Sequence, residues 1–151
     1  MRPVDTGMTY FSGLLLAMRL VGLVNLGAVS VLFASGGLIV QEQDFRGLDI
    51  HGLGAIGVHI TSGLLATALI LYTWVSKTGA LQALLAVTLC GFTFLQAWLG
   101  SSMTLAIHIT GALVLTVIST WLTAWTFSSR RRRDMRRASQ RRHHHSEGTS
   151  A

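Results

Sequence analysis

The sequence predicts an all-α membrane protein, a bundle of four transmembrane helices that run up, down, up and down. Half of the 151 residues are apolar and only 12% are charged, whereas soluble domains carry about 25% charged residues. Each of four stretches without Asp, Glu, Lys or Arg has close to the ~20 residues that cross a bilayer core. In lipid such segments must be helical, because their backbone amides have to be paired internally. The stretches are Leu20–Val40, Leu53–Trp74, Leu81–Leu99 and Met103–Trp125.

The charges divide the chain into three predicted parts. These are a cytoplasmic or interfacial N-terminal segment (1–19), the transmembrane domain (20–128) and a basic, disordered cytoplasmic tail (129–151). Residues 1–129 carry four cations and four anions, so the whole formal charge of +6 belongs to the tail. Because Lys and Arg accumulate on the cytoplasmic side of spans, we expect a multi-pass protein of the plasma (bacterial inner) membrane with both termini cytoplasmic.

The tail contains eight arginines between Arg130 and Arg142. Such a polybasic segment attracts anionic lipid head groups, and its simpler interpretation is a topology determinant followed by disorder. We expect no specific nucleic-acid partner. The triplet His143–His145 has no further ligands nearby in the sequence and fits an ordinary low-complexity run.

Composition excludes one class of membrane protein and makes another the least favoured. Cys90 is the single cysteine of the chain, so a thiol–disulfide oxidoreductase with a C-x-x-C pair is excluded. Coupled transport needs an intramembrane carboxylate or a broken helix. The four uncharged stretches contain no Asp or Glu, which places a transporter last among the functions considered.

Two histidines lie inside the uncharged stretches, His59 in the second and His108 in the fourth. Shifting the second stretch by 49 residues onto the fourth aligns both histidines and favours duplication of a two-helix unit. The shift also pairs Ile60 with Ile109, Thr61 with Thr110, Leu64 with Leu113 and Thr67 with Thr116. Counted from the starts of their stretches, the two histidines lie about 9 and 8 Å deep, and we expect them at the same level.

The second and fourth helices of such a bundle are diagonal partners. With neighbouring axes 8–10 Å apart the diagonal is roughly 11–14 Å, which suits two imidazoles with a planar iron porphyrin between them. Haem iron accepts axial imidazole nitrogen. We therefore predict one haem b (protohaem) per chain, with His59 and His108 as metal ligands. The alternative is that each histidine makes only an interhelical hydrogen bond, which is worth about 1 kcal/mol or less in membranes.

Two further residues are assigned to cofactor binding, Arg46 and His51. Arg46 is the only cation on the predicted outer side, and His51 lies ~12 Å outward of His59. Both would reach haem propionates that point outward. The simpler interpretation of His51 is a solvated loop histidine. The hydroxyls of Thr61, Thr104 and Thr110 are candidates to hold the second nitrogen of a ligating ring.

The pattern resembles the haem A synthases, membrane proteins built from two similar four-helix bundles with paired haem-ligating histidines on the second and fourth helices of each. Residues 20–125 are similar to one half-unit, with His59 and His108 at the corresponding places. The segment LQAWLG (95–100) is similar to the family's Gln and Gly before the fourth helix. The chain departs from the family where Ile60, in place of arginine, follows His59, and it lacks the outer cysteine pair and the second bundle.

These observations favour a b-type membrane haem protein with bis-histidine ligation, which transfers electrons or handles haem for a respiratory partner. Whether it converts a substrate is left open, because the resemblance supports haem binding better than haem A synthesis. The competing function is a non-catalytic accessory subunit of a larger respiratory complex, without a cofactor of its own.

Overall fold

The structure, a computed structural model, consists of four long helices. Its described residues are 6–42, 45–102 and 105–147, with side chains described for 12–41, 46–100 and 105–128. The helices are α1 (Thr6–Glu42), α2 (Phe45–Ser76), α3 (Ala80–Ser102) and α4 (Leu105–Glu147). The prediction of an all-α protein with four membrane-spanning helices is therefore confirmed.

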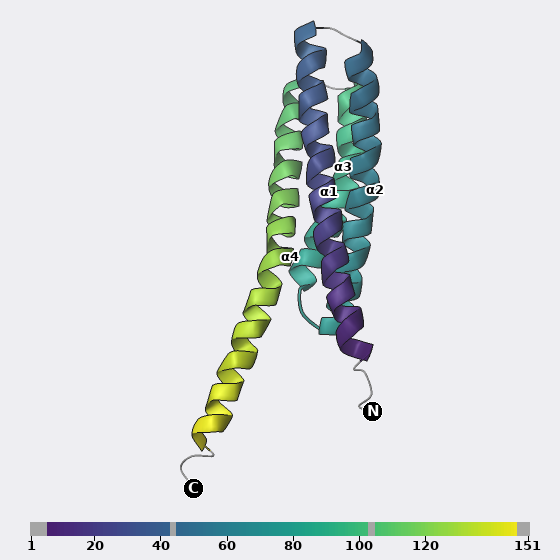
Figure 1. The fold of residues 1–151 in the computed structure, drawn as a ribbon. Coiled ribbons are helices and arrows are strands. Elements are labelled where there is room, and N and C mark those ends of the chain that lie inside the picture. Colours follow the sequence, from purple (N-terminus) through teal and green to yellow (C-terminus); the bar gives the residue numbers. More distant parts are fainter. Residues whose placement is uncertain (1–5, 43–44, 103–104, 148–151) are drawn as a thin grey trace.

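The four helices close into a ring in which each packs on its neighbours in sequence and α1 packs on α4 (Figure 1). Helices α1 and α3, and likewise α2 and α4, face each other diagonally. We call the end where α1 joins α2 and α3 joins α4 the histidine end, because it carries His51 and His108. The opposite end, where both termini lie, carries Arg19 and is called the arginine end.

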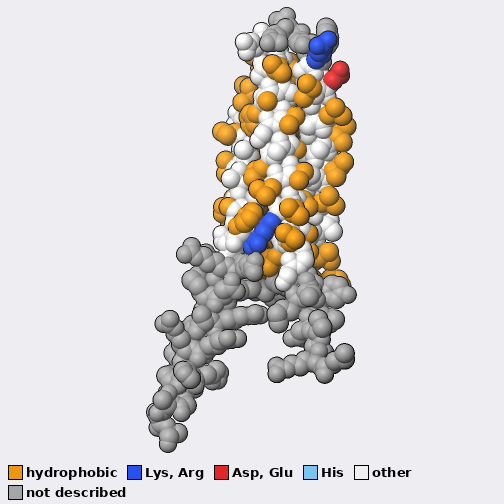
Figure 2. Space-filling model, in the orientation of Figure 1, with side chains coloured by type: hydrophobic (Ala, Val, Ile, Leu, Met, Phe, Trp, Pro, Cys, Tyr) orange, Lys and Arg blue, Asp and Glu red, His pale blue; other side chains and the backbone are white. Residues whose placement is uncertain are grey.

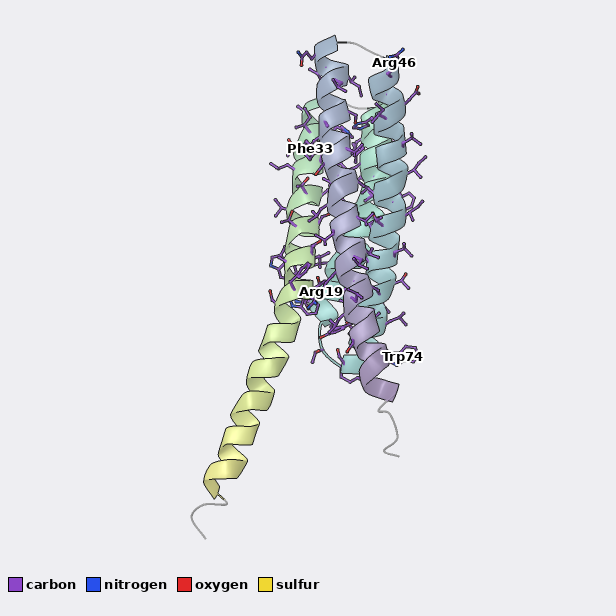
Figure 3. The ribbon with its side chains drawn as sticks, viewed as in Figure 1. Arg19, Phe33, Arg46 and Trp74 are labelled. Atoms are coloured by element: carbon purple, nitrogen blue, oxygen red, sulfur yellow. The ribbon has the colours of Figure 1, made fainter. Side chains whose placement is uncertain are left out.

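The face of the bundle in Figure 2 carries mainly hydrophobic side chains, as the sequence predicts for a protein surrounded by lipid. Four segments, one on each helix, are long and apolar enough to cross a membrane. Large side chains such as Trp74, Leu53 and Phe94 are exposed on the outside, where lipid replaces water as the contact. The chain is thus a multi-pass membrane protein, and Trp74 points away from the helices in Figure 3.

The two hairpins differ in length. The apolar segments of α1 and α2 contain 30 and 31 residues, and those of α3 and α4 contain 21 and 24. In Figure 1 the α1–α2 hairpin accordingly extends beyond the α3–α4 hairpin at the histidine end. Equal counts from the starts of α2 and α4 therefore do not correspond to equal depths, which matters for the histidines.

The structure differs from the predicted boundaries at both ends of the chain. Helix α1 begins at Thr6 and runs without a break through Arg19, and Leu15 and Met18 are buried in the bundle before residue 20. Helix α4 continues to Glu147, whereas disorder was predicted from residue 129. Arginine is a good helix former, and residues 129–147 contain neither Gly nor Pro to interrupt it. The arginine and histidine side chains of the tail lie outside the described residues.

Arg19 lies within the apolar segment of α1, where a charge needs compensation. Its Nε and Nη2 groups donate to the carbonyl oxygen of Thr126 at 3.3 Å, and its guanidinium stands 5.0 Å from the ring centroid of Phe127. These contacts join α1 to α4 near the arginine end, where Figure 3 labels Arg19.

A buried amide connects three helices in the middle of the bundle. Asn25 of α1 has no exposed surface; it donates to Ser119 Oγ of α4 at 3.1 Å and accepts from Thr61 Oγ1 of α2 at 2.7 Å. Because lipid cannot replace these partners, the network favours one packing of α1, α2 and α4 over others.

Replacing Asn25 with leucine is expected to lower the free energy of unfolding by about 1–2 kcal/mol, since it leaves the Ser119 and Thr61 hydroxyls without their interhelical partner. Denaturant titration of purified protein in detergent measures this. The control is Ser30→Ala on the same helix, because exposed Ser30 bonds, among the described residues, to the Leu26 carbonyl of its own helix. Equal stabilities of the two variants would contradict a structural role for the network.

Candidate functional site

The structure brings His51 and His108 together at the histidine end. Their ring centroids are 6.2 Å apart and the ring planes are inclined by 56°. The rings come from diagonal helices, α2 and α4, and so meet across the middle of the bundle. Diagonal helices do provide a facing pair of imidazoles, as the sequence analysis expects, but the α2 member of the pair is His51.

His59 is not level with His108, so that expectation is wrong. His59 lies eight residues beyond His51 along α2, which is ~12 Å farther into the bundle. Depths counted from the starts of the uncharged stretches give nearly equal values for His59 and His108. In the structure α2 already begins at Phe45 and reaches past the start of α4, which raises His51 to the level of His108.

His51 is a half-buried residue inside α2, and the expectation of a solvated loop histidine is wrong. Its Nδ1 lies 3.1 Å from the carbonyl oxygen of Leu32 and 3.1 Å from Ser35 Oγ, both on α1. A carbonyl oxygen can only accept a hydrogen bond, so Nδ1 carries the proton. The lone pair is then on Nε2, which is the arrangement found in metal-ligating histidines.

His59 has the same tautomer but a different neighbour. Its Nδ1 donates to the Ala55 carbonyl oxygen of its own helix at 2.6 Å, and its ring stands edge-on against Phe94 of α3 with centroids 4.4 Å apart. This geometry turns the ring toward α3. The described contacts of His59 therefore involve an aromatic side chain and its own backbone.

His108 is half-buried, and its Nδ1 is shielded from solvent without a hydrogen-bond partner among the described residues. The ring lies directly against Gly100 of α3. A Cβ at position 100 would stand 3.0 Å from Cε1 and 3.3 Å from Nδ1 of the ring. A larger residue at this position would push the imidazole away from the α3 backbone by a few tenths of an ångström.

Helices α2 and α4 repeat the same pattern at an offset of 57 residues. Each contains H-x-x-G-A, at residues 51–55 and 108–112. At this offset buried residues fall on buried residues: Val58 on Leu115, Ser62 on Ser119, Leu65 on Leu122 and Leu69 on Thr126. The offset of 49 residues pairs buried Thr61 with exposed Thr110 and is wrong as a structural equivalence. The repeated H-x-x-G-A motif is the signal that identifies His51 in the sequence.

Helices α1 and α3 show a corresponding repeat at an offset of 64 residues. Gly36 faces the His51 ring, with a Cβ there 3.8 Å from Cε1, as Gly100 faces the His108 ring. In the same way Leu32 of α1 packs over Gly54, and Gln96 of α3 packs over Gly111. The chain thus contains two similar half-sites. In each, a histidine faces one glycine of the neighbouring helix, and a side chain of that helix packs on a second glycine, which follows the histidine by three residues.

The other predicted residues fall as follows. Arg46 is exposed at the histidine end, five residues before His51 (Figure 3). Thr61 bonds to Asn25 and to the Gly57 carbonyl, and Thr110 to the Ala106 carbonyl, so neither hydroxyl is bonded to a histidine nitrogen. Thr104 lies outside the described residues. The sequence did not predict the polar partners of the two α2 histidines. His51 bonds to the Leu32 carbonyl and the Ser35 hydroxyl, and His59 bonds to the Ala55 carbonyl.

The donor set limits the kinds of metal that the site can hold. Among the described side chains, no group of three or more His, Cys, Asp and Glu residues is placed to bind a metal ion. A bare zinc ion needs four ligands in a structural site and three protein ligands in a catalytic one. Two imidazoles can complete the coordination of a metal that already has four donors of its own, as iron in haem does.

The spacing of the rings fits that arrangement. A metal–imidazole bond is about 2 Å long, and the ring centre lies about 1 Å beyond the bonding nitrogen, so two imidazoles on opposite sides of one metal have centroids roughly 6 Å apart. The observed 6.2 Å agrees with this value. The His108 ring lies tightly against Gly100, and the His51 ring lies at ordinary contact distance from a Cβ placed at Gly36.

Comparison of the chain with protein-family models, with curated proteins and with solved structures finds no match in any of the three.

Proposed function

We propose that the chain is a b-type membrane haem protein in which His51 and His108 are the two axial ligands of one haem. The observation that carries the proposal is the 6.2 Å separation of the two imidazoles across the bundle. The Leu32 carbonyl supports it further, because it holds His51 in the tautomer that leaves Nε2 able to bind a metal.

The residues of the chain have distinct parts in this function. Leu32 and Ser35 orient the ring of His51, and Gly36 and Gly100 admit the two rings to the middle of the bundle. When bound, haem with two imidazole ligands supplies one-electron redox chemistry. Exposed Arg46 is the described cation at the histidine end that is suited to anionic propionates.

The physiological role follows from this chemistry and from the resemblance to haem A synthases. We infer electron transfer or haem handling for a respiratory partner protein in a bacterial inner membrane, with both termini cytoplasmic and the basic tail on anionic lipid. Conversion of a substrate is not part of the proposal. The family resemblance was based on His59, and the spacing of the rings now favours His51 in its place.

Wild-type protein purified from haem-replete cells is expected to contain one protohaem per chain and to show the sharp reduced-minus-oxidised spectrum of low-spin, six-coordinate iron. Optical difference spectroscopy together with a haem-to-protein ratio measures this. Protein that is folded in detergent, by circular dichroism and size-exclusion chromatography, but contains no haem would refute the proposal.

One observation favours the alternative, an accessory subunit without its own cofactor. His51 already joins α2 to α1 through Ser35 and the Leu32 carbonyl, and an interhelical bond of this kind stabilises a membrane bundle without any metal. Co-purification of a respiratory oxidase or dehydrogenase with haem-free protein would support this function. A haem-containing protein with the expected spectrum would exclude it.

A further inference from the structure

We propose that Gln96 is the positioning residue for His108, and that the Nδ1–H of His108 donates to a water molecule that in turn donates to Oε1 of Gln96. The inference rests on the proposed function, since its consequence is the control of an axial ligand. Gln96 would act through His108 and would not touch the iron.

The first observation is the burial of unpartnered polar atoms on both sides of the α3–α4 contact. Gln96 is 5% exposed, and neither its Oε1 nor its Nε2 has a hydrogen-bond partner among the described residues. The same holds for Nδ1 of His108. Buried polar groups are normally paired, with protein or with ordered water. Three such atoms lie on two residues of adjacent helices, so Gln96 and His108 both need a hydrogen-bond partner at this contact.

The second observation is that the two side chains lie about one helical turn apart along the same contact. The His108 ring lies against Gly100, and the Gln96 amide lies against Gly111, where an added Cβ would overlap it. Gln96 and Gly100 are four residues apart on α3, and His108 and Gly111 are three apart on α4. Residues at this spacing on one helix have Cβ atoms ~5–6 Å apart, so the imidazole and the amide lie about one helical turn apart, a gap that a bridging water can span.

The third observation comes from the repeat between the hairpins. In the first half-site, Ser35 Oγ and the Leu32 carbonyl hold Nδ1 of His51. At the offset of 64 residues Leu99 stands in place of Ser35 and Gln96 in place of Leu32. The second half-site thus lacks the hydroxyl but contains an amide one turn away. His108 thus has a polar side chain nearby, as His51 does, but at a different position on the neighbouring helix.

An acceptor for Nδ1–H fixes the tautomer of His108 and makes Nε2 a stronger electron donor. Gln96→Leu is therefore expected to raise the midpoint potential of the haem and to speed haem loss in competition with apomyoglobin. A merely structural role would lower the melting temperature without moving the potential. The double variant Gln96→Leu with Leu99→Ser restores a hydroxyl at the place equivalent to Ser35 and is expected to return the potential toward that of the wild type.

The matched control is Gln82→Leu, the other glutamine of α3. Gln82 lies at the arginine end, where its amide, oriented to satisfy both neighbours, donates to the Gly79 carbonyl and accepts from Trp125 Nε1, each at 3.2 Å. This variant is expected to keep the wild-type potential. An unchanged potential and an unchanged rate of haem loss in Gln96→Leu would overturn the inference while leaving haem binding intact.

A second measurement does not depend on haem. In apoprotein labelled with ¹⁵N-histidine, NMR is expected to show a slowly exchanging Nδ1–H on His108 that disappears in Gln96→Leu and remains in Gln82→Leu. If the wild type binds no haem, the proposed function fails and this signal alone decides the hydrogen bond. A His108 Nδ1–H that exchanges equally in all three proteins would overturn the inference.

Discussion

His51→Ala and His108→Ala are each expected to abolish the low-spin haem spectrum and to weaken haem binding more than roughly 100-fold. Loss of a residue that only supports a metal ligand already costs 10- to 100-fold in affinity, and each variant removes a ligand itself. His59→Ala is expected to retain the haem and its six-coordinate spectrum, because the described contacts of His59 are with Phe94 and the Ala55 carbonyl.

This series separates the pair seen in the structure from the pair predicted from the sequence. The measurements are the haem-to-protein ratio and the oxidised and reduced spectra of the three purified variants. His59→Ala serves as the matched control, since it removes the same side chain from the same helix as His51→Ala. Loss of haem in His59→Ala and His108→Ala, with retention in His51→Ala, would show that the 49-residue pair is the ligand pair.

A second test distinguishes a lost ligand from a lost fold. His108→Gly leaves a space beside Gly100 that free imidazole can enter, and added imidazole is expected to restore the low-spin spectrum. Restoration would show that the remaining bundle is intact and that the variant lacked only a nitrogen ligand. Protein that stays high-spin at saturating imidazole, although haem is bound and the helices are folded, would contradict axial ligation at position 108.

Gly22→Leu is expected to destabilise the protein by about 1–3 kcal/mol or more, because it forces α1 and α4 apart. A Cβ at position 22 would stand 2.8 Å from Oγ1, 3.2 Å from Cγ2 and 3.3 Å from Cβ of Thr123. These atoms belong to a short side chain that is buried between the helices and has little freedom to move. The helix axes must therefore separate.

The control for this prediction is Gly27→Leu on the same helix. A Cβ at Gly27 meets nothing within 4 Å, and leucine favours a helix over glycine by roughly 0.5–1 kcal/mol, so this variant is expected to be neutral or slightly stabilising. Denaturant titration in detergent compares the two. Equal free energies of unfolding would show that α1 and α4 are not in the close contact that the structure gives.

Some features of the protein follow from composition and local pattern, and these were predicted correctly. Uncharged stretches of about twenty residues force helices in lipid, and four of them joined by short connections make neighbours antiparallel. The diagonal placement of α2 and α4 follows directly from this order. The idea of an imidazole from each of these two helices meeting across the bundle was therefore accessible from the sequence.

The identity of the second imidazole was not accessible in the same way. His51 and His59 lie on the same helix, and a choice between them depends on how far α2 projects beyond α4. The projection results from the greater length of the α1–α2 hairpin, which the uncharged stretches understate because Arg46 and Asp49 interrupt them. The H-x-x-G-A repeat, at an offset of 57 residues, aligns His51 with His108. The offset of 49 residues aligns more identical residues at exposed positions and therefore favours His59.

The sequence by itself determined that this chain is a membrane bundle with a facing pair of helices, since the need to pair backbone amides in lipid acts on every apolar stretch regardless of its neighbours. Only the tertiary structure decided which residues meet between those helices. The meeting of His51 with His108, of His108 with Gly100 and of Gln96 with Gly111 depends on the axial stagger of the two hairpins. That stagger is set by side-chain packing over the whole length of the helices, which a local pattern does not contain.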